Sequence, residues 1–298
     1  MLWLFKIASL LPLAALHALG GILGWAVWLV SSAYRQRFRD NSAQAGVPFD
    51  KARPAIAEAG RFVAELPRLW LRPPDESCMR NVQTQGLDIA NLALAQGKGV
   101  IFFGPHCGSF ELGPQALAEV LGPKHGVVTA IYRPARQAWL ATIELQARQR
   151  PFLSVLPASL SAIKTMHRAV KGGGSVALLA DQVPPEGLGV WAPFFGKPAY
   201  TMTLAARLAL QTGAALLPVS CERLAKGRGY IVKIWPAVDL PPDASLLNTV
   251  TCINQAIEAI VLSQPGQYLW GYGRYKTPRQ NLVSRPLAPQ PSANKDAV

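Results

Sequence analysis

The chain is short of acidic residues. Seventeen Asp and Glu against 30 Lys and Arg leave a net charge of +13 over 298 residues. Only 16% of the residues are charged while 50% are hydrophobic, which is too much apolar side chain for a disordered protein. The length allows one α/β domain of roughly 250 residues with a sizeable core. The positive excess indicates an anionic partner: nucleic acid, an acidic protein or anionic lipid.

Cysteine is also scarce, and no C-x-x-C spacing occurs among Cys78, Cys107, Cys221 and Cys252. This spacing suggests neither a zinc ribbon nor a dense disulfide framework, and it favours a reducing compartment. The sequence has no nucleic-acid fold motif and no basic repeat interleaved with aromatic residues. Nucleic acid is therefore the least favoured of the anionic partners.

Charge is absent from the N-terminal segment, where the 28 residues from Ile7 to Tyr34 contain no Asp, Glu, Lys or Arg. As one helix this run would be about 42 Å long, against a hydrocarbon core of about 30 Å. We therefore expect a membrane anchor over residues 1–39. The basic flank that follows, Arg35, Arg37 and Arg39, predicts that the body of the protein is cytoplasmic.

Other readings of this segment stay open. A cleaved signal peptide would have a shorter apolar core and would carry its positive charge in front of it. Pro12 and the pair Gly20-Gly21 weaken a straight helix. A hydrophobic hairpin lying in one leaflet and a buried core helix are therefore alternatives to a spanning helix.

The rest of the chain divides at about residue 100. Residues 40–96 have the pattern of short helices separated by prolines. Beyond them, apolar β-type runs are expected as strands at 100–103, 127–132, 152–156, 176–180, 214–220 and 230–235. Helical patterns lie between most of them, near 112–121, 137–149, 160–170, 202–211 and 246–263. This alternation predicts an α/β sheet flanked by helices, with a main domain over 40–276 and a loose Pro-rich tail over 277–298.

The first candidate site is the run from His106 to Glu111, between an expected strand and an expected helix. Five residues apart on one continuous helix, these side chains would point about 140° apart, so they can meet only across a turn. Pro114 is best tolerated in a first helical turn, which places the helix start near Leu112 or Gly113. Glu111 could then accept a hydrogen bond from one imidazole nitrogen while the other takes a proton from a hydroxyl. Alternatively, His106 is a half-buried histidine and Glu111 a stabilising charge at a helix N-terminus.

Two further clues accompany this run. Asp181 and Gln182 end an expected strand and precede a Pro- and Gly-rich stretch to Gly196 that is expected as a loop. An Asx-turn at Asp181 is an equal alternative. Residues 122–171 carry eight Lys and Arg but a single acidic residue, Glu144. A surface of one sign favours an anionic substrate or an acidic carrier protein, and the planar fork of arginine suits phosphate.

In this order the motifs resemble the late acyltransferases of lipid A biosynthesis, the lauroyl and myristoyl transferases that use acyl carrier protein thioesters. The resemblance rests on an H-x4-E element and on several later elements. These are His106–Glu111, Tyr132-Arg133-Pro134 with Arg148 and Arg150, Asp181-Gln182, Pro193-Phe194-Phe195-Gly196 with Thr201, and Gln267-Tyr268-Leu269-Trp270 with Arg274, Tyr275 and Lys276.

The resemblance implies a glycerol-phosphate-acyltransferase-like α/β fold in a single-pass inner-membrane enzyme with its catalytic domain on the cytoplasmic side. It implies that His106 and Glu111 act as a general-base dyad. It also implies further catalytic residues, Arg148 and Asp181, and substrate-binding residues, Arg133, Arg150, Gln182 and Arg274.

The expected reaction moves a fatty acyl chain from acyl carrier protein to a hydroxyl of a phosphorylated lipid A precursor, and it needs neither metal nor organic cofactor. Two alternatives stay open. One is a different membrane glycolipid or phospholipid acceptor, and the other is a non-catalytic membrane protein that binds anionic lipid.

Overall fold

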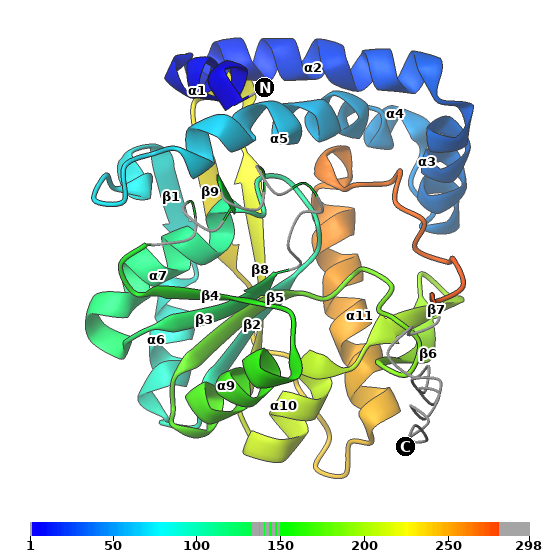
Figure 1. Cartoon of the computed structure of the whole chain (residues 1–298). Helices are drawn as coiled ribbons and strands as arrows, with labels where there is room; N and C mark the ends of the chain where they lie inside the picture. The colour runs from blue at the N-terminus through cyan, green and yellow to red at the C-terminus, as the bar shows by residue number, and fades with distance from the viewer. Residues whose placement is uncertain are drawn as a thin grey trace, which may run out of the picture.

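The computed structural model describes residues 2–132, 137, 140, 143–144, 147 and 150–279. Its centre is a seven-stranded mixed sheet in the order β1-β9-β8-β2-β5-β3-β4 (Figure 1). The strands are β1 (Val82–Gln85), β2 (Val100–Gly104), β3 (Val128–Tyr132), β4 (Leu153–Pro157), β5 (Ser175–Leu179), β8 (Ala215–Arg223) and β9 (Tyr230–Ile234).

Five neighbouring strands of this sheet, β8, β2, β5, β3 and β4, are parallel, whereas β9 runs antiparallel to β8 and β1 runs parallel to β9. In the register of β2 with β5, Gly104 lies opposite Leu179. Because the two strands are parallel, the loops that follow them leave the sheet at the same edge. This edge holds the candidate site.

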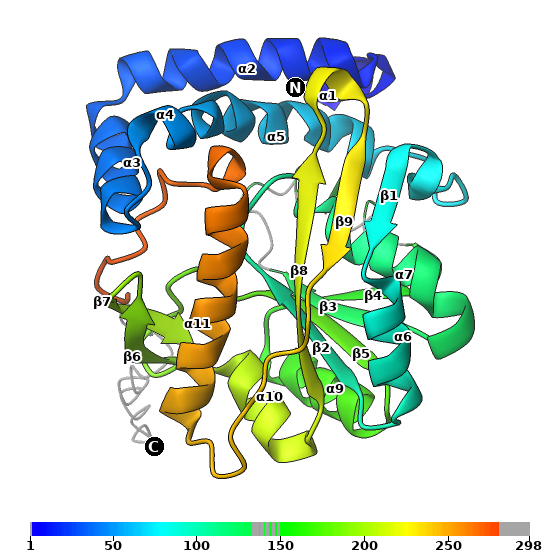
Figure 2. The ribbon, with the colours of Figure 1, turned by 180° about the vertical axis from the view of Figure 1, so that it is seen from behind.

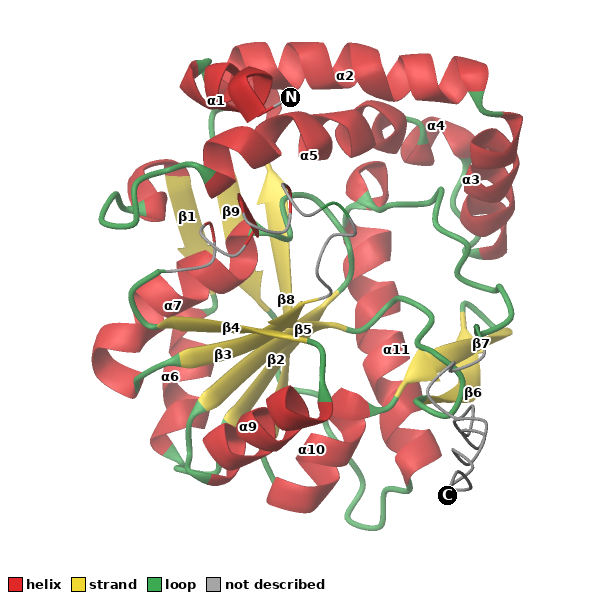
Figure 3. Ribbon diagram, viewed as in Figure 1, coloured by secondary structure: helices red, strands yellow, loops and turns green. Residues whose placement is uncertain are grey.

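Helices cover both faces of the sheet (Figure 3). Val100 and Phe102 of β2 belong to the cluster with α6 (Leu87–Ala95) and α7 (Leu112–His125). Ile101 and Phe103 belong to the cluster on the other face, with α9 (Leu160–Lys171), α10 (Leu204–Thr212) and α11 (Leu246–Ser263). A strand buried on both faces has a continuous apolar sequence, as the run 100–103 has.

These observations confirm the predicted fold class. The strands expected from residue 100 onward are present with ends shifted by one to three residues, and α7 begins at Leu112 as the position of Pro114 predicts. Most of the helix expected at 137–149 lies outside the described residues.

Two segments were predicted wrongly. The Pro- and Gly-rich stretch up to residue 196, expected as a loop, contains β6 (Gly189–Phe194), which pairs antiparallel with β7 (Lys197–Met202) in a separate hairpin. The segment 40–96, expected as helical, contains β1. The errors have different causes. β1 is a short edge strand with a largely polar sequence, whereas β6 has an apolar run that contains Pro193 and follows several prolines and glycines, which favoured a loop.

The N-terminal helices form a separate layer across one end of the molecule (Figures 1 and 2). They are α1 (Leu2–Leu10), α2 (Leu13–Val30), α3 (Ser32–Gln44), α4 (Phe49–Ala52) and α5 (Pro54–Trp70), and short 3-10 turns lie further on at Cys78–Asn81, Ala225–Gly227 and Pro265–Gln267. The long apolar run is not one helix, because it breaks before Pro12. By length and composition α2 and α11 could each cross a membrane, but the same test admits core helices, and α11 packs in the core.

Candidate active site

The loop after β2 is held from two sides. The backbone N–H of Gly108 donates to the carbonyl of Gln267 (3.1 Å), and that of Ser109 donates to the carbonyl of Cys221 (2.8 Å). Gly108 has a φ of +61°, and a Cβ there would lie 2.0 Å from the Cys221 oxygen, so a side chain cannot be placed without a shift of backbone. The loop therefore presents His106 in one defined position.

A buried carboxylate orients the His106 imidazole. Oδ1 of Asp181 lies 2.6 Å from Nδ1 of His106, and Oδ2 accepts the backbone N–H of the same residue at 3.0 Å. Burial by itself would raise the pKa of Asp181, but the charge and hydrogen bonds of His106 outweigh it and hold that pKa below its ordinary value. With Nδ1 engaged, Nε2 is the nitrogen left to exchange a proton with a substrate.

Aromatic rings pack against the His106 imidazole. The Phe110 ring meets the His106 ring edge to face, with centroids 4.6 Å apart, and stacks on Phe62 of α5 at 4.2 Å. His106 keeps 16% of its side chain exposed, whereas Asp181 is almost fully buried. The ring is thus packed on one side and partly open to a ligand.

Glu111, the second predicted member of the dyad, lies at the N-cap position of α7. Its Oε2 accepts a hydrogen bond from the indole Nε1 of Trp70 at 3.3 Å. The carboxylate on Nδ1 of His106 is that of Asp181, so a direct pairing of His106 with Glu111 stays a prediction. Glu111 lines the cavity that opens beside the loop.

That cavity has a volume of about 110 Å³ and lies between the sheet and the first turns of α7. Gly104, Pro105, Phe110 and Glu111 place it next to the His106 loop. The remainder of its wall is mainly apolar and includes Phe102, Leu117, Ala130, Leu153, Val155 and Leu178. An apolar cavity with a few polar groups at one side suits a hydrocarbon chain that carries its reactive group at one end.

The sequence matches the model of one protein family, described as bacterial lipid A biosynthesis acyltransferase, over residues 1–277. This match covers most of the chain, and it includes the His106 loop, Asp181 and the cavity wall. The chain belongs to this acyltransferase family.

The names of relatives of this chain refer to two lipid classes. This chain is 28% identical to the lipid A biosynthesis lauroyltransferase of Escherichia coli over 76% of the chain and 72% of the relative. It is also 28% identical to the palmitoleoyltransferase of the same organism, over 73% of the chain and 69% of the relative. A phosphatidylinositol mannoside acyltransferase of Mycobacterium tuberculosis is 30% identical over 52% of the chain and 48% of the relative.

Two arginines near the cavity have side-chain N–H groups that donate no hydrogen bond to any described residue. Nε and Nη1 of Arg150 and Nε of Arg72 have no hydrogen-bond partner among the described residues. Burial, with the nearby charge of Arg72 added to it, lowers the pKa of Arg150 to about 10. Arg72 donates to the side chain of Gln115 (2.8 Å), which is part of the cavity wall. Cations of this kind suit an anionic substrate group, and substrate binding by Arg150 stays a prediction.

The other predicted binding residues have different surroundings. Arg274 is buried, donates to the Tyr200 carbonyl (2.9 Å) and the Thr201 hydroxyl (2.6 Å), and lies over the Phe194 ring. These are internal contacts to the β6–β7 hairpin, and substrate binding by Arg274 stays a prediction. Gln182 is half-buried beside Asp181. Arg133 and Arg148 lie outside the described residues.

Sequence reasoning missed the buried ion network behind the loop. Arg223 of β8 binds the carboxylates of Glu58 and Glu65 of α5, and its Nη2 donates to the Gly108 carbonyl at 3.2 Å. A signal was available, because Glu58 and Glu65 are seven residues apart and so lie on one face of a helix. Their partner could not be read from the pattern, since it comes from a strand more than 150 residues away.

Proposed function

We propose that this protein transfers a fatty acyl chain from an acyl carrier protein thioester to a hydroxyl group of a lipid A precursor at the inner membrane. The observation that carries the proposal is the His106–Asp181 pair beside an apolar cavity. The apolar cavity is assigned to the part of the acyl chain next to the thioester, and the pair supplies a positioned base. The E. coli relatives, named for lipid A biosynthesis, support the acceptor class.

In the proposed reaction Nε2 of His106 takes the proton of the acceptor hydroxyl while the oxygen attacks the thioester carbonyl. Asp181 stabilises the imidazolium that forms and keeps the ring in place. When the tetrahedral intermediate collapses, the C–S bond breaks, an ester remains, and the imidazolium returns its proton to the departing sulfur. Glu111, on the cavity wall, is assigned to hold the acceptor hydroxyl in position.

Anionic groups occur on both substrates: the phosphorylated glycolipid, and the phosphodiester arm of the carrier protein. Arg150 and Arg72 are assigned to such a group because, within the described part of the chain, Nε and Nη1 of Arg150 and Nε of Arg72 have no hydrogen-bond partner. We also assign the other predicted binding residues to substrate binding; they are Arg133, Gln182 and Arg274. Arg148 keeps its predicted role at the reacting centre.

The experiment is acyl transfer in mixed micelles with acyl carrier protein thioester and a lipid A precursor. His106→Ala should lower kcat by about 10²- to 10⁴-fold, the usual loss for a positioned base. Asp181→Asn should also lower kcat, because it removes the negative charge that keeps the proton on Nδ1 and stabilises the imidazolium. His167→Ala, a half-buried histidine on α9, is the matched control and should keep normal turnover. Normal turnover by the His106 variant would refute the base assignment.

A second acceptor class is supported by the Mycobacterium tuberculosis relative, whose name gives phosphatidylinositol mannoside. The same assay with that glycolipid in place of the lipid A precursor distinguishes the two. Mass spectrometry of lipid A from cells lacking this protein gives an independent answer, since the proposal requires the loss of one acyl mass. Unchanged lipid A would exclude the lipid A acceptor.

A further inference from the structure

Helix α2 has two different faces although its sequence is apolar except for His17. Leu16, Gly20, Gly24 and Trp28 are buried against the rest of the protein. The opposite face is exposed and carries only apolar side chains, with Ile22 at 69% and Leu29 at 72% of full exposure and with Leu19, Leu23, Val27 and Val30 around them. A stripe of this kind is unusual on a soluble surface and indicates an apolar partner.

The inner face of α2 touches the backbone of α5. A Cβ on Gly24 would lie 2.1 Å from the Ile56 carbonyl oxygen, and a Cβ on Gly60 would lie 2.0 Å from the Gly20 carbonyl oxygen. Helices approach this closely only where both lack side chains at the crossing. The glycines that weaken α2 as a straight spanning helix thus serve its packing on α5.

Polar contacts lock the same interface. Nε2 of His17 lies 3.0 Å from Oε2 of Glu65, and Nε of Arg61 donates to the His17 carbonyl at 3.2 Å. Glu65 in turn binds Arg223 of the central sheet. Near the start of α2, Gly227 after β8 approaches Ala14 so closely that a Cβ would lie 2.5 Å from the Ala14 nitrogen. The helix is therefore attached to the body along its length.

These contacts conflict with a spanning arrangement. If α2 crossed the bilayer in its observed packing, α5 would enter the hydrocarbon beside it and would carry Glu58, Arg61 and Glu65 with it. Charged side chains at that depth cost several kcal/mol each, and separating the helices would leave the Glu65 and Arg223 network without its cover. An α2 that lies parallel to the membrane surface avoids both costs.

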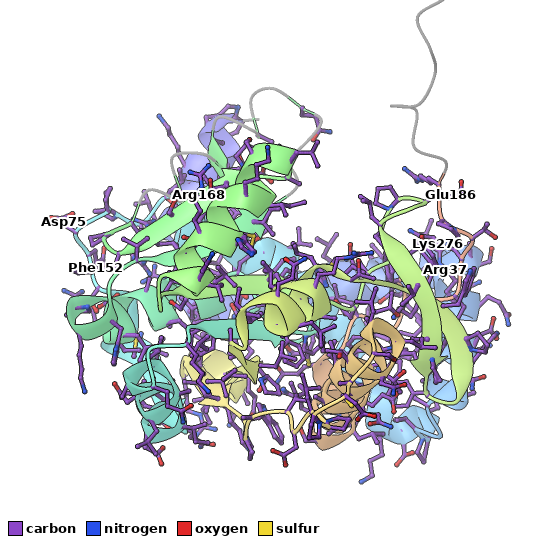
Figure 4. All side chains as sticks on the ribbon, turned by 90° about the horizontal axis from the view of Figure 1, so that it is seen from below. Arg37, Asp75, Phe152, Arg168, Glu186 and Lys276 are labelled. Carbon is purple, nitrogen blue, oxygen red and sulfur yellow. The ribbon has the colours of Figure 1, made fainter. Side chains whose placement is uncertain are left out.

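The borders of the exposed face suit a membrane surface. Exposed Arg53 lies over the ring of half-buried Trp25 (5.3 Å), which pairs a cation with an aromatic residue as at lipid headgroups. A shallow groove of about 470 Å³ between α2 and α5 is lined by Gly21, Ile22, Trp25, Leu29, Ala57 and Arg61. Elsewhere charged side chains project outward, such as Arg168, Glu186 and Lys276 (Figure 4).

We propose that α2 lies in the plane of the membrane, with its exposed apolar face in the hydrocarbon of one leaflet and its inner face on α5. The lipid chains of that leaflet cover Ile22 and Leu29, and Arg53 at the border of this face contacts anionic headgroups. The protein is attached to one leaflet and does not cross the bilayer.

This arrangement sets the position of the candidate active site. Phe62 of α5 stacks on Phe110, which contacts His106, so one helix layer separates the lipid-facing helix from the catalytic loop. An acceptor lipid in the same leaflet therefore reaches the site from the side of the membrane that carries the body.

The first test is labelling with a membrane-impermeant maleimide in inverted and right-side-out vesicles. Lys6→Cys and Ser32→Cys place reporters before and after α2 in a Cys252→Ser background, because the other three cysteines are buried. Both reporters should react from the same side, the side that carries the body. A Lys6→Cys reporter that reacts from the opposite side, or fails to react where Ser32→Cys reacts, overturns the proposal. Loss of the Lys6 charge favours a spanning orientation, so the test is biased against the proposal.

The second test uses Gly24→Leu, with Ala26→Leu on the exposed face as the matched control. Packing on α5 predicts that Gly24→Leu lowers the thermal midpoint in micelles by at least about 4 °C, whereas Ala26→Leu leaves it unchanged. A free spanning helix would tolerate both, and equal midpoints would overturn the proposal. Neither test measures catalysis, so a failure here is distinct from a failure of the proposed acyl transfer.

Discussion

At the residue scale, the carboxylate of Asp181 makes two hydrogen bonds to His106, one to the ring and one to the backbone N–H. A carboxylate held in this way can neither rotate nor leave without breaking both bonds, so the ring has one orientation before any substrate arrives. Such preorganisation is what a proton-transfer catalyst needs, because the acceptor atom is already in place when the hydroxyl attacks.

Arg150 gives a prediction at this scale. Arg150→Ala should raise KM for the phosphorylated substrate roughly tenfold and leave kcat within a few-fold, since charged hydrogen bonds are typically worth about 1.5–3 kcal/mol. Kinetics with each substrate varied in turn show whether donor or acceptor carries the anion. Arg80→Ala is the control, because Arg80 is exposed and pairs only loosely with Glu76. An unchanged KM for both substrates would exclude Arg150 from binding.

Glu65 gives a prediction about the stability of the protein at low pH. Burial alone would raise its pKa, but Arg223 and then His17 outweigh burial and hold the pKa below its ordinary value. A carboxyl of this kind stabilises the fold fully above its unfolded pKa of about 4.3, and the contribution is lost as pH falls through the folded pKa.

We expect Glu65→Gln to lose about 3–5 kcal/mol of unfolding free energy at pH 7, because Arg223 is left incompletely paired. The difference in unfolding free energy between this variant and the unmodified protein should narrow below about pH 4. Denaturant midpoints of both proteins from pH 7 to pH 3 provide the measurement. A gap that is constant across this range would show that the charge of Glu65 has no part in the stability.

At the scale of elements, β2 and the loop after it act as one rigid support. The strand is buried on both faces, and the loop bonds to β8 on one side and to the segment after α11 on the other. The position of His106 thus depends on three parts of the chain that are distant in sequence.

Gly108→Ala tests this dependence. The added Cβ meets the Cys221 carbonyl at 2.0 Å and the φ of +61° is strained for alanine, so we expect a stability loss of about 1–3 kcal/mol. We also expect kcat to fall about 10²-fold, because a small shift of His106 misplaces the base. Gly97→Ala is the control: its φ is also positive, but no atom lies within 4 Å of the added Cβ. Similar kinetics for the two variants would argue against a positioning role of the loop.

At the scale of the whole molecule, the N-terminal layer is part of the folded body. Leu16 and Trp28 of α2 are buried, and the partners of α2 on α5 continue into the network that reaches Gly108. An anchor joined by a free linker could be removed without harm to the domain, whereas this layer cannot.

We therefore predict that deletion of residues 1–30 yields an insoluble or molten protein. Deletion of residues 280–298, beyond the end of the family match, should leave thermal stability and turnover unchanged. We would compare the two truncated proteins by their solubility, near-UV circular dichroism and acyl-transfer activity. A soluble, active protein lacking residues 1–30 would show that α2 is dispensable for the fold.

The sequence by itself determined the features that depend on neighbouring residues. Apolar period and proline position predicted the strands from residue 100 onward and the start of α7, and the His106 loop followed from its place between a strand and a helix. The lack of charge from Ile7 to Tyr34 identified the apolar N-terminal segment.

Only the tertiary structure decided which distant groups meet. The placement of β5 beside β2 brought Asp181 to His106, and the placement of β8 under α5 brought Arg223 to Glu58 and Glu65. The pairing of α2 with α5 decided which face of the apolar helix is exposed. Local patterns encode the shape and amphipathicity of each segment, but strand order and helix packing are set by the free energy of the whole core, to which residues more than 150 positions apart contribute together.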